Sequence, residues 1–407
     1  MPVQRILPLL LAIIVACWAA IAPACPFCDS LPRTLSDDLE ESSAAVVAHP
    51  EAVSTEPDGI RVYRMRITDV LKGAPALKNS VVNVTSAREI SSAKNFWLVG
   101  YGDDRLQWFP PTAITSEGIA YLRGLSGLPE SGPQRLEYFL RFLQHTEDFI
   151  AADAYNEFAE SSLKDIKGLG DKLSRDWVIA QLRDTAVPLH RRRLCWTFLS
   201  QCGTAQDTGL FDDALRKRRS DPSFNPGMDA AISCFISLGG EQALARIEQD
   251  FLANPATKES DCFSAVSAIR VHGTELNVIP RERLATALRH LLARPELADL
   301  VIPDLSRWGD WSAIDRMVEL FQISTEETAL LKPAAVRYLK TCPLPDATAA
   351  LEKLRAIDGN AVQVAEASMR FNLGRASLPV PPPDLDEPTL NANDLRAPEV
   401  ADQSQGQ

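Results

Sequence analysis

The sequence lacks the complete short motifs of the commonest enzyme classes. It has no H-E-x-x-H, no G-x-S-x-G and no P-loop, and Gly168-Leu169-Gly170 lacks the third glycine of a dinucleotide site. None of its five histidines forms an i, i+4 pair with another ligand in a recognisable metal motif. We therefore expect no cofactor and favour a binding function over an enzymatic one.

An excess of positive charge is also absent. The formal net charge is −12, which argues against non-specific binding to nucleic acid or anionic lipid, though not against a local basic patch. Hydrophobic residues make up 45% and charged residues 24% of the chain, as in ordinary soluble proteins. A chain of 407 residues exceeds what one hydrophobic core usually serves, so two domains or an extended array are expected.

Long hydrophobic runs are missing except at the chain start. Arg5 precedes an apolar stretch from Ile6 to Ile21, and Ala22-Pro23-Ala24 fits an A-x-A cleavage site. The pattern predicts a signal peptide over residues 1–24 and export to the periplasm or the extracellular space. The run is short for a membrane span and no second one follows, so no transmembrane anchor is expected in the mature chain. Lipidation at Cys17 is a less favoured alternative.

Cysteines are few, and the first pair after the predicted cleavage site is Cys25-Pro-Phe-Cys28. If Cys17 leaves with the signal peptide, seven of the eight cysteines remain, and the five beyond Cys28 lie in helical segments where they read as small buried hydrophobes. Cys25 and Cys28 are candidates for a structural disulfide, a redox pair or half of a metal site. Cleavage after Ala24 leaves no strand before Cys25, which excludes a complete thioredoxin fold there, and Asp29 replaces the histidine of a c-type haem site.

Residues 44 to 114 have the alternation of β-strands. In the stretch from Ile60 to Leu71, Tyr63, Met65 and Ile67 alternate with polar residues, which indicates one buried and one solvated face. Further strands are predicted over 44–53, 81–84, 96–101 and 106–109. Several short strands separated by turn signals predict a small β-barrel or sandwich.

This first part resembles the netrin-like, OB-type module of the tissue inhibitors of metalloproteinases. The shared order is a cysteine-containing start, a short helix (35–41), a first strand, a turn, a long strand ending in Lys72-Gly73 and a further strand. The resemblance implies an OB-like module over residues 25–130. It also implies a third possible function, protease inhibition through the N-terminal cysteine, but the family's first motif is Cys-x-Cys and no cysteines lie between 45 and 107 to pair with it.

From Pro133 the hydrophobic period changes from two to that of an α-helix, and a repeat emerges. Five segments align on Gly203, Gly239, Gly273, Gly309 and Pro343, with spacings of 36, 34, 36 and 34 residues. Each copy reads as a helix, a glycine or proline stop and a second helix. We predict a HEAT-like α-solenoid over residues 131–376, in which the large residues Trp196, Phe198, Phe235, Trp308 and Phe321 belong to the core.

Nearly the whole chain also resembles exported bacterial proteins of unknown function with HEAT-like repeats. The stretch that carries this resemblance runs from Tyr138-Phe139-Leu140 to the Asp153-Ala154-Tyr155 segment. After Ala376 the chain becomes rich in proline and acidic residues with few large apolar groups. This composition predicts a disordered tail over residues 377–407.

One electrostatic feature stands out in this acidic chain. Three arginines open one predicted helix and four basic residues end its antiparallel partner, so both groups are expected at one edge; they are Arg191, Arg192, Arg193, Arg216, Lys217, Arg218 and Arg219. We call these seven residues the basic edge. The edge is either a solvated surface with acidic neighbours or a docking site for an anionic partner.

The sequence therefore predicts an exported α+β protein with a β-barrel-like module followed by a HEAT-like solenoid. We expect it to act as a non-catalytic binding or scaffold protein for a protein or another macromolecule. The alternative is a thiol-disulfide or metal-handling role centred on Cys25 and Cys28, and protease inhibition comes third.

Overall fold

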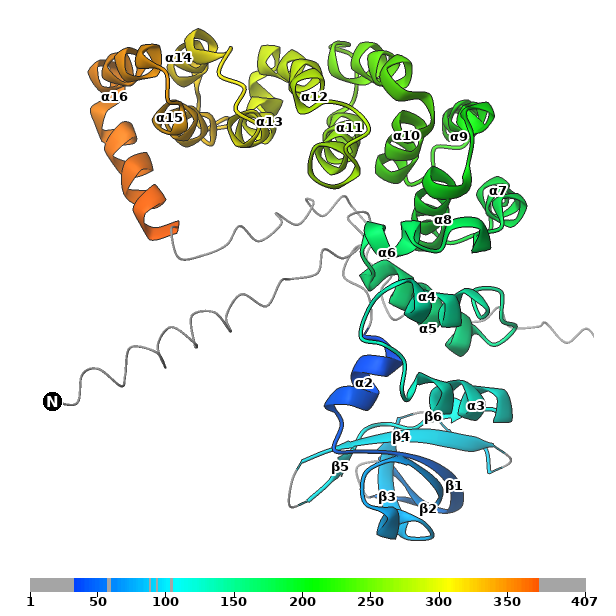
Figure 1. The fold of residues 1–407 in the computed structure, drawn as a ribbon. Helices are drawn as coiled ribbons and strands as arrows, with labels where there is room; N and C mark the ends of the chain where they lie inside the picture. Colours follow the sequence, from blue (N-terminus) through cyan, green and yellow to red (C-terminus); the bar gives the residue numbers. More distant parts are fainter. Residues whose placement is uncertain (1–32, 57–59, 88, 93, 103–104, 373–407) are drawn as a thin grey trace, which may run out of the picture. The chain divides into compact units, whose positions relative to one another are not determined.

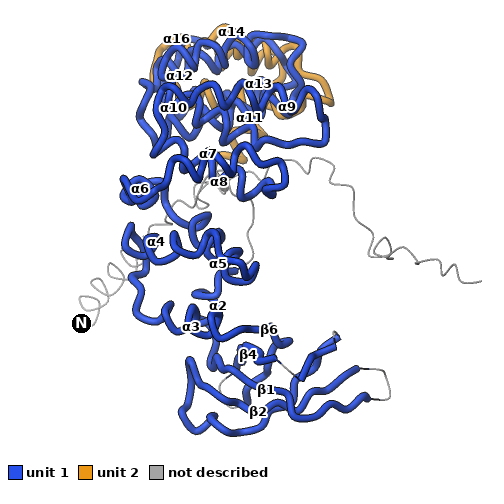
Figure 2. The backbone as a smooth tube through the Cα atoms, turned by 90° about the vertical axis from the view of Figure 1, so that its right-hand side faces the viewer, with its two compact units in different colours: residues 1–313 blue, residues 314–407 orange. Residues whose placement is uncertain are grey.

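A computed structural model describes residues 33–56, 60–87, 89–92, 94–102 and 105–372, shown in Figure 1. The chain forms two compact units, residues 1–313 and 314–407, coloured separately in Figure 2. The boundary after Ala313 falls inside the region predicted to form one helical domain. The predicted signal peptide, Cys25, Cys28 and the predicted tail all lie outside the described residues.

The first described element is the short helix that the sequence predicts, α2 (Leu35–Glu41). Thr34 and Asp37 form a capping box, in which the Thr34 side chain accepts the N–H of Asp37 and the Asp37 carboxylate accepts the N–H of Thr34, both at 3.1 Å. These bonds satisfy N–H groups that the first helical turn leaves without partners. The helix ends at Ser42, which leads directly into the first strand.

Six strands form one antiparallel sheet in the order β3-β2-β1-β4-β5, with β6 also paired to β4. They are β1 (Ala44–Thr55), β2 (Arg61–Lys72), β3 (Val81–Ser86), β4 (Asn95–Tyr101), β5 (Gln107–Trp108) and β6 (Thr112–Ile114). The predicted strand positions are confirmed, but the predicted closed barrel is wrong. The sheet is open because β3 and β5 end the strand order and do not pair, and β5 is only two residues long.

The alternation predicted for β2 is confirmed. Tyr63, Met65 and Ile67 are buried in a core that also contains Val46 and Leu98, whereas the neighbouring Arg64 is exposed. The central strand β1 is buried on both faces over its first five residues, as expected for a strand with neighbours on each side and cover above and below.

Helix α3 (Ser116–Leu125) and α5 (Asp148–Glu160) join the sheet to the helical part. Trp97 of β4 packs edge-on against Phe149 at the start of α5, with ring centroids 6.1 Å apart. Lys72, the last residue of β2, donates from its ammonium group to the carbonyls of Leu39 and Glu40, which are orphan acceptors at the end of α2. The sheet, α2, α3 and α5 therefore share one packed region.

The remaining helices of the first unit follow in sequence. They are α4 (Pro133–Leu140), α6 (Leu163–Lys167), α7 (Arg175–Arg183), α8 (Leu189–Cys202), α9 (Gly209–Ser220), α10 (Met228–Ile247), α11 (Glu259–Val271), α12 (Arg281–Leu288) and α13 (Pro295–Arg307). Of the aromatic residues expected in their core, Trp196, Phe198 and Phe235 are buried and Trp308 is partly buried.

The residues on which the repeat was aligned all stand at helix ends or breaks. Gly203 is the C-cap of α8, Gly239 precedes a kink inside α10, and Gly273 lies in a π-helical turn after α11. Gly309 follows the C-cap of α13 with a φ of 73°, and Pro343 follows the C-cap of α15.

Ion pairs connect helical segments separated by about one repeat. The pairs, with sequence separations of 34 to 36 residues, are Lys172–Glu137, Arg193–Asp229, Arg246–Asp212, Arg270–Asp304 and Arg283–Glu248. Regular cross-links of this kind are compatible with stacked repeats. The HEAT-like solenoid itself stays a prediction.

The second unit contains α14 (Ile314–Ile323), α15 (Leu331–Thr341) and α16 (Pro345–Asn372). Phe321 and Tyr338 are fully buried in it. Helix α16 breaks at Asp358, whose carboxylate accepts from the Lys332 ammonium at 2.7 Å.

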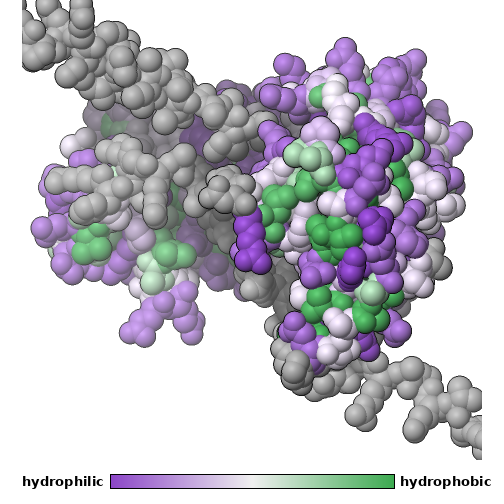
Figure 3. Space-filling model, turned by 90° about the horizontal axis from the view of Figure 1, so that it is seen from below, coloured by the Kyte–Doolittle hydropathy of each residue, from purple (hydrophilic) through white to green (hydrophobic). Residues whose placement is uncertain are grey.

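The surface around the sheet is mixed in character. Figure 3 shows hydrophobic side chains interspersed with hydrophilic ones on the near face of the part that carries the sheet. Among the helices that the structure describes, none has the length and apolar character needed to cross a membrane.

Candidate functional site

The basic edge forms part of a pocket. The beginning of α8 and the end of α9 meet beside a cavity of about 360 Å³, and three of the seven predicted residues line it: Arg192, Arg216 and Lys217. Arg183, at the end of α7, adds a fourth cation. We call this cavity the basic pocket. Asp213, which pairs with Arg216 at 2.8 Å, is its single lining carboxylate among the described residues.

Arg192 is the buried cation of the basic pocket. Only 4% of its surface is exposed, and its hydrogen bonds with described residues all go to backbone carbonyls, those of Asn225, Thr185 and Val187. Its Nε has no hydrogen-bond partner in the described part of the chain. Burial lowers the pKa of the Arg192 guanidinium, which nevertheless stays charged at neutral pH because arginine's ordinary pKa exceeds 12. No carboxylate pairs directly with Arg192 among the described residues, and the charge of Asp184 offsets the desolvation of the guanidinium only in part.

Aromatic and apolar groups form the wall of the basic pocket. The Arg192 guanidinium lies 4.5 Å from the centroid of the Phe224 ring, and the Lys217 ammonium lies 5.8 Å from it. Trp196 lines the same cavity and donates its indole N–H to the carbonyl of Pro226 at 2.8 Å. The pocket thus presents cations above a largely apolar surface, a combination suited to an anionic group attached to an apolar body.

The other four residues of the basic edge lie outside the lining of this pocket. Arg191 stacks on Tyr155 at 4.6 Å, Arg193 pairs with Asp229 at 3.2 Å, and Arg218 pairs with Asp261 at 2.5 Å. Arg219 is exposed at the end of α9. The structure therefore gives the three arginines Arg191, Arg193 and Arg218 contacts within the fold.

Sequence reasoning missed Arg183, Phe224 and Trp196 as pocket residues. Trp196 is buried as the sequence predicts but also lines the pocket, and Arg183 stands alone, eight residues before the Arg191-Arg192-Arg193 run, so it belongs to no basic cluster in the sequence. Because α7 immediately precedes α8, the antiparallel packing of neighbouring helices that predicts the basic edge could also have placed Arg183 there.

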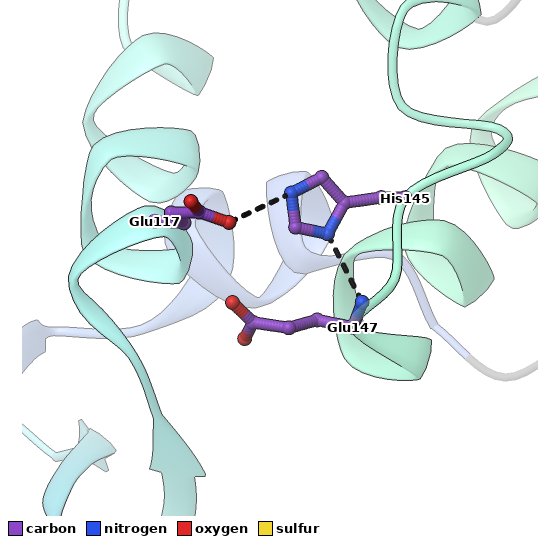
Figure 4. A group of neighbouring side chains, drawn as sticks. All are labelled: Glu117, His145 and Glu147. Carbon is purple, nitrogen blue, oxygen red and sulfur yellow. Dashed lines mark hydrogen bonds and ion pairs between the residues drawn. The ribbon is translucent and has the colours of Figure 1, made fainter.

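A second group of titratable side chains lies where α3 meets the segment before α5 (Figure 4). Potential ligand atoms of Glu117, His145 and Glu147 lie within 4.8 Å of one another, a spacing compatible with a metal ion. The His145 Nε2 lies 3.2 Å from a Glu117 carboxylate oxygen, and the Thr115 hydroxyl donates to Glu147.

The hydrogen bonds of His145 disfavour metal ligation in this arrangement. Its Nδ1 accepts the backbone N–H of Glu147 at 3.1 Å, so the ring proton of the neutral form resides on Nε2, facing Glu117. A histidine that binds a metal through Nε2 normally donates a proton from Nδ1 to a second group. Metal binding would have to break the Glu147 bond, and the geometry fits a link from the α5 N-terminus to α3.

Cys25 and Cys28, the remaining candidates from the sequence, lie outside the described residues. Of the cysteines that the structure describes, all five are free: Cys195, Cys202, Cys234, Cys262 and Cys342. Comparisons with protein-family models, with characterised proteins and with solved structures gave no match.

Proposed function

We propose that this protein is an exported, non-catalytic binding protein that holds an acidic segment of a partner protein in the basic pocket. The supporting observation is Arg192, a buried guanidinium that hydrogen-bonds only to carbonyls among the described residues and lines a cavity rimmed by Arg183, Arg216 and Lys217. A carboxylate in the cavity would offset the desolvation of that guanidinium, and arginine's planar fork matches a carboxylate well.

The size and walls of the pocket favour a peptide over a nucleic acid. A cavity of about 360 Å³ accommodates one or two side chains, and Phe224 and Trp196 offer apolar contact to the residue beside the carboxylate. The net charge of −12 would repel an extended polyanion, whereas a short acidic segment meets only the local cations.

The repeat architecture supports a scaffold role. We propose that the helical part is a HEAT-like solenoid and that the chain belongs with exported proteins built this way. Ion pairs separated by 34 to 36 residues and helix breaks at the aligned glycines agree with that architecture. Solenoids present extended surfaces to macromolecular partners. The netrin-like identity of the first module and the roles of Cys25 and Cys28 remain separate hypotheses.

The experiment is a titration of the full chain with a fluorescein-labelled peptide of alternating glutamate and leucine, followed by fluorescence anisotropy at two salt concentrations. The test variant is Arg183→Gln/Arg216→Gln, because neither side chain holds a buried contact. We expect it to weaken binding about tenfold or more, and we expect wild-type binding to weaken as salt rises.

The control variant, Arg219→Gln/Lys353→Gln, removes the same amount of charge at exposed positions outside the pocket lining. It should bind the acidic peptide like the wild type, and neither protein should bind a peptide in which glutamine replaces glutamate. If both variants lost the same affinity for the acidic peptide, net charge alone would explain the effect and the basic pocket would not be the site. Failure of the wild type to bind the acidic peptide would also contradict the proposal.

A further inference from the structure

A larger cavity of opposite charge lies beside the sheet. It has a volume of about 590 Å³ and is bounded by α2, the end of β2, the connection from α3 to α4, and the end of α5. Six carboxylates line it: Asp37, Glu40, Glu130, Glu157, Glu160 and Asp165. We call it the acidic cavity. Its two lining cations are Lys72 and Arg135.

Both cations already have partners within the fold. Lys72 donates to the carbonyls at the end of α2, at 2.8 and 2.5 Å. Arg135 donates from Nε and Nη2 to the same oxygen of Glu157, at 3.0 and 2.6 Å, and from Nη1 to the carbonyl of Pro129. Neither cation therefore neutralises the remaining carboxylates directly.

Glu157 supplies the observation that points to a ligand. Only 4% of its side chain is exposed, one carboxylate oxygen takes both bonds from Arg135, and the other, Oε1, has no hydrogen-bond partner among the described residues. The hydroxyl of Ser36, which also lines the cavity, is buried and likewise without a partner there. A buried carboxylate oxygen that lacks a donor is costly, so the site is suited to a ligand that brings one.

The walls of the acidic cavity identify the shape of that ligand. Leucines from several elements line it beside the carboxylates, among them Leu39, Leu71, Leu125, Leu128 and Leu136. A bare metal ion needs no apolar contact and far less volume. An alkyl chain ending in an ammonium group matches the leucines with its stem and the carboxylates with its head.

We propose that the acidic cavity binds an alkylammonium group, with Glu157 and Glu160 as the acceptors of its N–H groups. The group can belong to a free diamine or to a lysine side chain of a partner segment. Arg135 holds Glu157 in position, and Glu160 lies three residues further along α5, at the end of the helix, where it also lines the cavity.

The protonation of Glu160 gives this binding a pH signature. The pKa of Glu160 is raised to about 7, mainly by partial desolvation and to a smaller extent by the negative charges of Asp37 and Glu157. Arg135 acts in the opposite direction, and Glu160 is an exposed residue. Glu40 and Asp165 add further negative charge around the cavity, and Lys72 adds positive charge. A bound cation favours ionised Glu160, so affinity should rise as the pH increases through about 7.

The test is calorimetric titration of the full chain with 1,5-diaminopentane and, separately, with a short acetylated peptide containing one lysine; 1-pentanol serves as the neutral probe. We expect at least one amine to bind, 1-pentanol not to bind, and Glu160→Gln to weaken amine binding about three- to tenfold and flatten its pH dependence. Glu157→Gln should weaken it further in protein whose circular dichroism matches the wild type.

The control is Glu282→Gln, the same replacement at an exposed position of α12 outside the cavity. It should leave amine binding unchanged. Binding of the lysine peptide alone would assign the site to a partner side chain, and binding of the diamine alone would assign it to a small molecule. If neither amine binds, or if Glu160→Gln binds like the wild type at every pH, the proposal is wrong.

Discussion

Asp153 is the residue on which the packing of α2 against α5 depends. Its carboxylate accepts the backbone N–H of Leu35 at 2.7 Å and the Tyr121 hydroxyl at 2.7 Å, and only 4% of the residue surface is exposed. Burial, with a smaller contribution from the negative charge of Glu157, raises the pKa of Asp153 to about 7, although the two donors and Arg135 act in the opposite direction. One carboxyl group thus joins α2, α3 and α5 while resisting ionisation.

Replacing Asp153 with asparagine should change how stability depends on pH. Between about pH 4 and 7 the unfolded chain releases the Asp153 proton while the folded chain keeps it, so the wild type loses stability as the pH rises, and the loss levels off above 7. The asparagine of the variant would not titrate, and its amide can accept from Leu35 and donate to Tyr121. The free energy of unfolding of Asp153→Asn minus that of the wild type, measured by urea unfolding, should therefore increase by roughly 2–4 kcal/mol between pH 4 and pH 8.

Asp176→Asn is the control for this comparison, because the Asp176 side chain is 96% exposed. Its stability should differ from that of the wild type by an amount that is small at both pH values. A pH-independent difference for Asp153→Asn would mean that Asp153 is ionised in the folded protein throughout this range.

At the scale of helices, Gly273 shows that a predicted helix stop can have a different physical cause. A Cβ atom at this position would lie 2.1 Å from Cζ2 of Trp308, so the glycine lets the turn after α11 approach the end of α13. Its φ is not in the left-handed region, in contrast to Gly309 at 73°. Close packing, and not backbone conformation, requires this glycine.

We predict that Gly273→Ala destabilises the protein by about 2 kcal/mol, because Trp308 must move to accommodate the methyl group. Gly209→Ala is the matched control, since Gly209 has helical φ and ψ of −60° and −22° and open space where the Cβ would lie. That change should leave stability unchanged or raise it by up to about 1 kcal/mol. Equal urea midpoints for the two variants would contradict the packing argument.

Elements with a strong local pattern could be predicted from the sequence. The start of α2 follows from the capping residues Thr34 and Asp37, and β2 follows from alternating side chains that one buried face requires. The open edge of the sheet could not be predicted, because closure depends on whether β3 meets β5, and neither strand's own residues decide that. Strand β6 follows Pro110-Pro111 and was not predicted, because proline residues usually end a strand.

The candidate sites likewise have parts that could be predicted from the sequence and parts that could not. The meeting of Arg192 with Arg216 and Lys217 follows from helix direction alone, but the internal partners of Arg193 and Arg218 lie 36 and 43 residues away and have no local signature. The acidic cavity escaped prediction because its carboxylates come from α2, the connection between α3 and α4, α5 and α6, which only the fold brings together.

The internal contacts also change the choice of variants at the basic edge. A charge reversal at Arg191, Arg192, Arg218 and Arg219 would test anionic binding cleanly only if these side chains had no contacts within the fold. In the structure Arg192 is buried and Arg218 pairs with Asp261, so that reversal would disturb packing together with binding. Arg183 and Arg216 separate the two effects.

At the scale of the whole molecule, cysteine chemistry separates the binding hypothesis from the thiol-disulfide alternative. Burial raises the pKa of Cys195 to about 12 and also raises those of Cys202, Cys234 and Cys262, so these thiols are poor nucleophiles in the folded protein. These four thiols are therefore poor candidates for a redox role, and Cys25 and Cys28 are the candidates that the sequence offers.

If Cys25 and Cys28 form a disulfide with each other, the protein denatured without reductant should have five reactive thiols, because the five described cysteines are free. Reduction should raise the count to seven, and the intact mass should correspond to a chain that begins at Cys25. In Cys28→Ser the count without reductant should be six, because Cys25 loses its partner. Seven thiols before reduction would contradict a structural disulfide and favour the redox or metal hypothesis, and eight after reduction would show that Cys17 is retained and that cleavage does not follow Ala24.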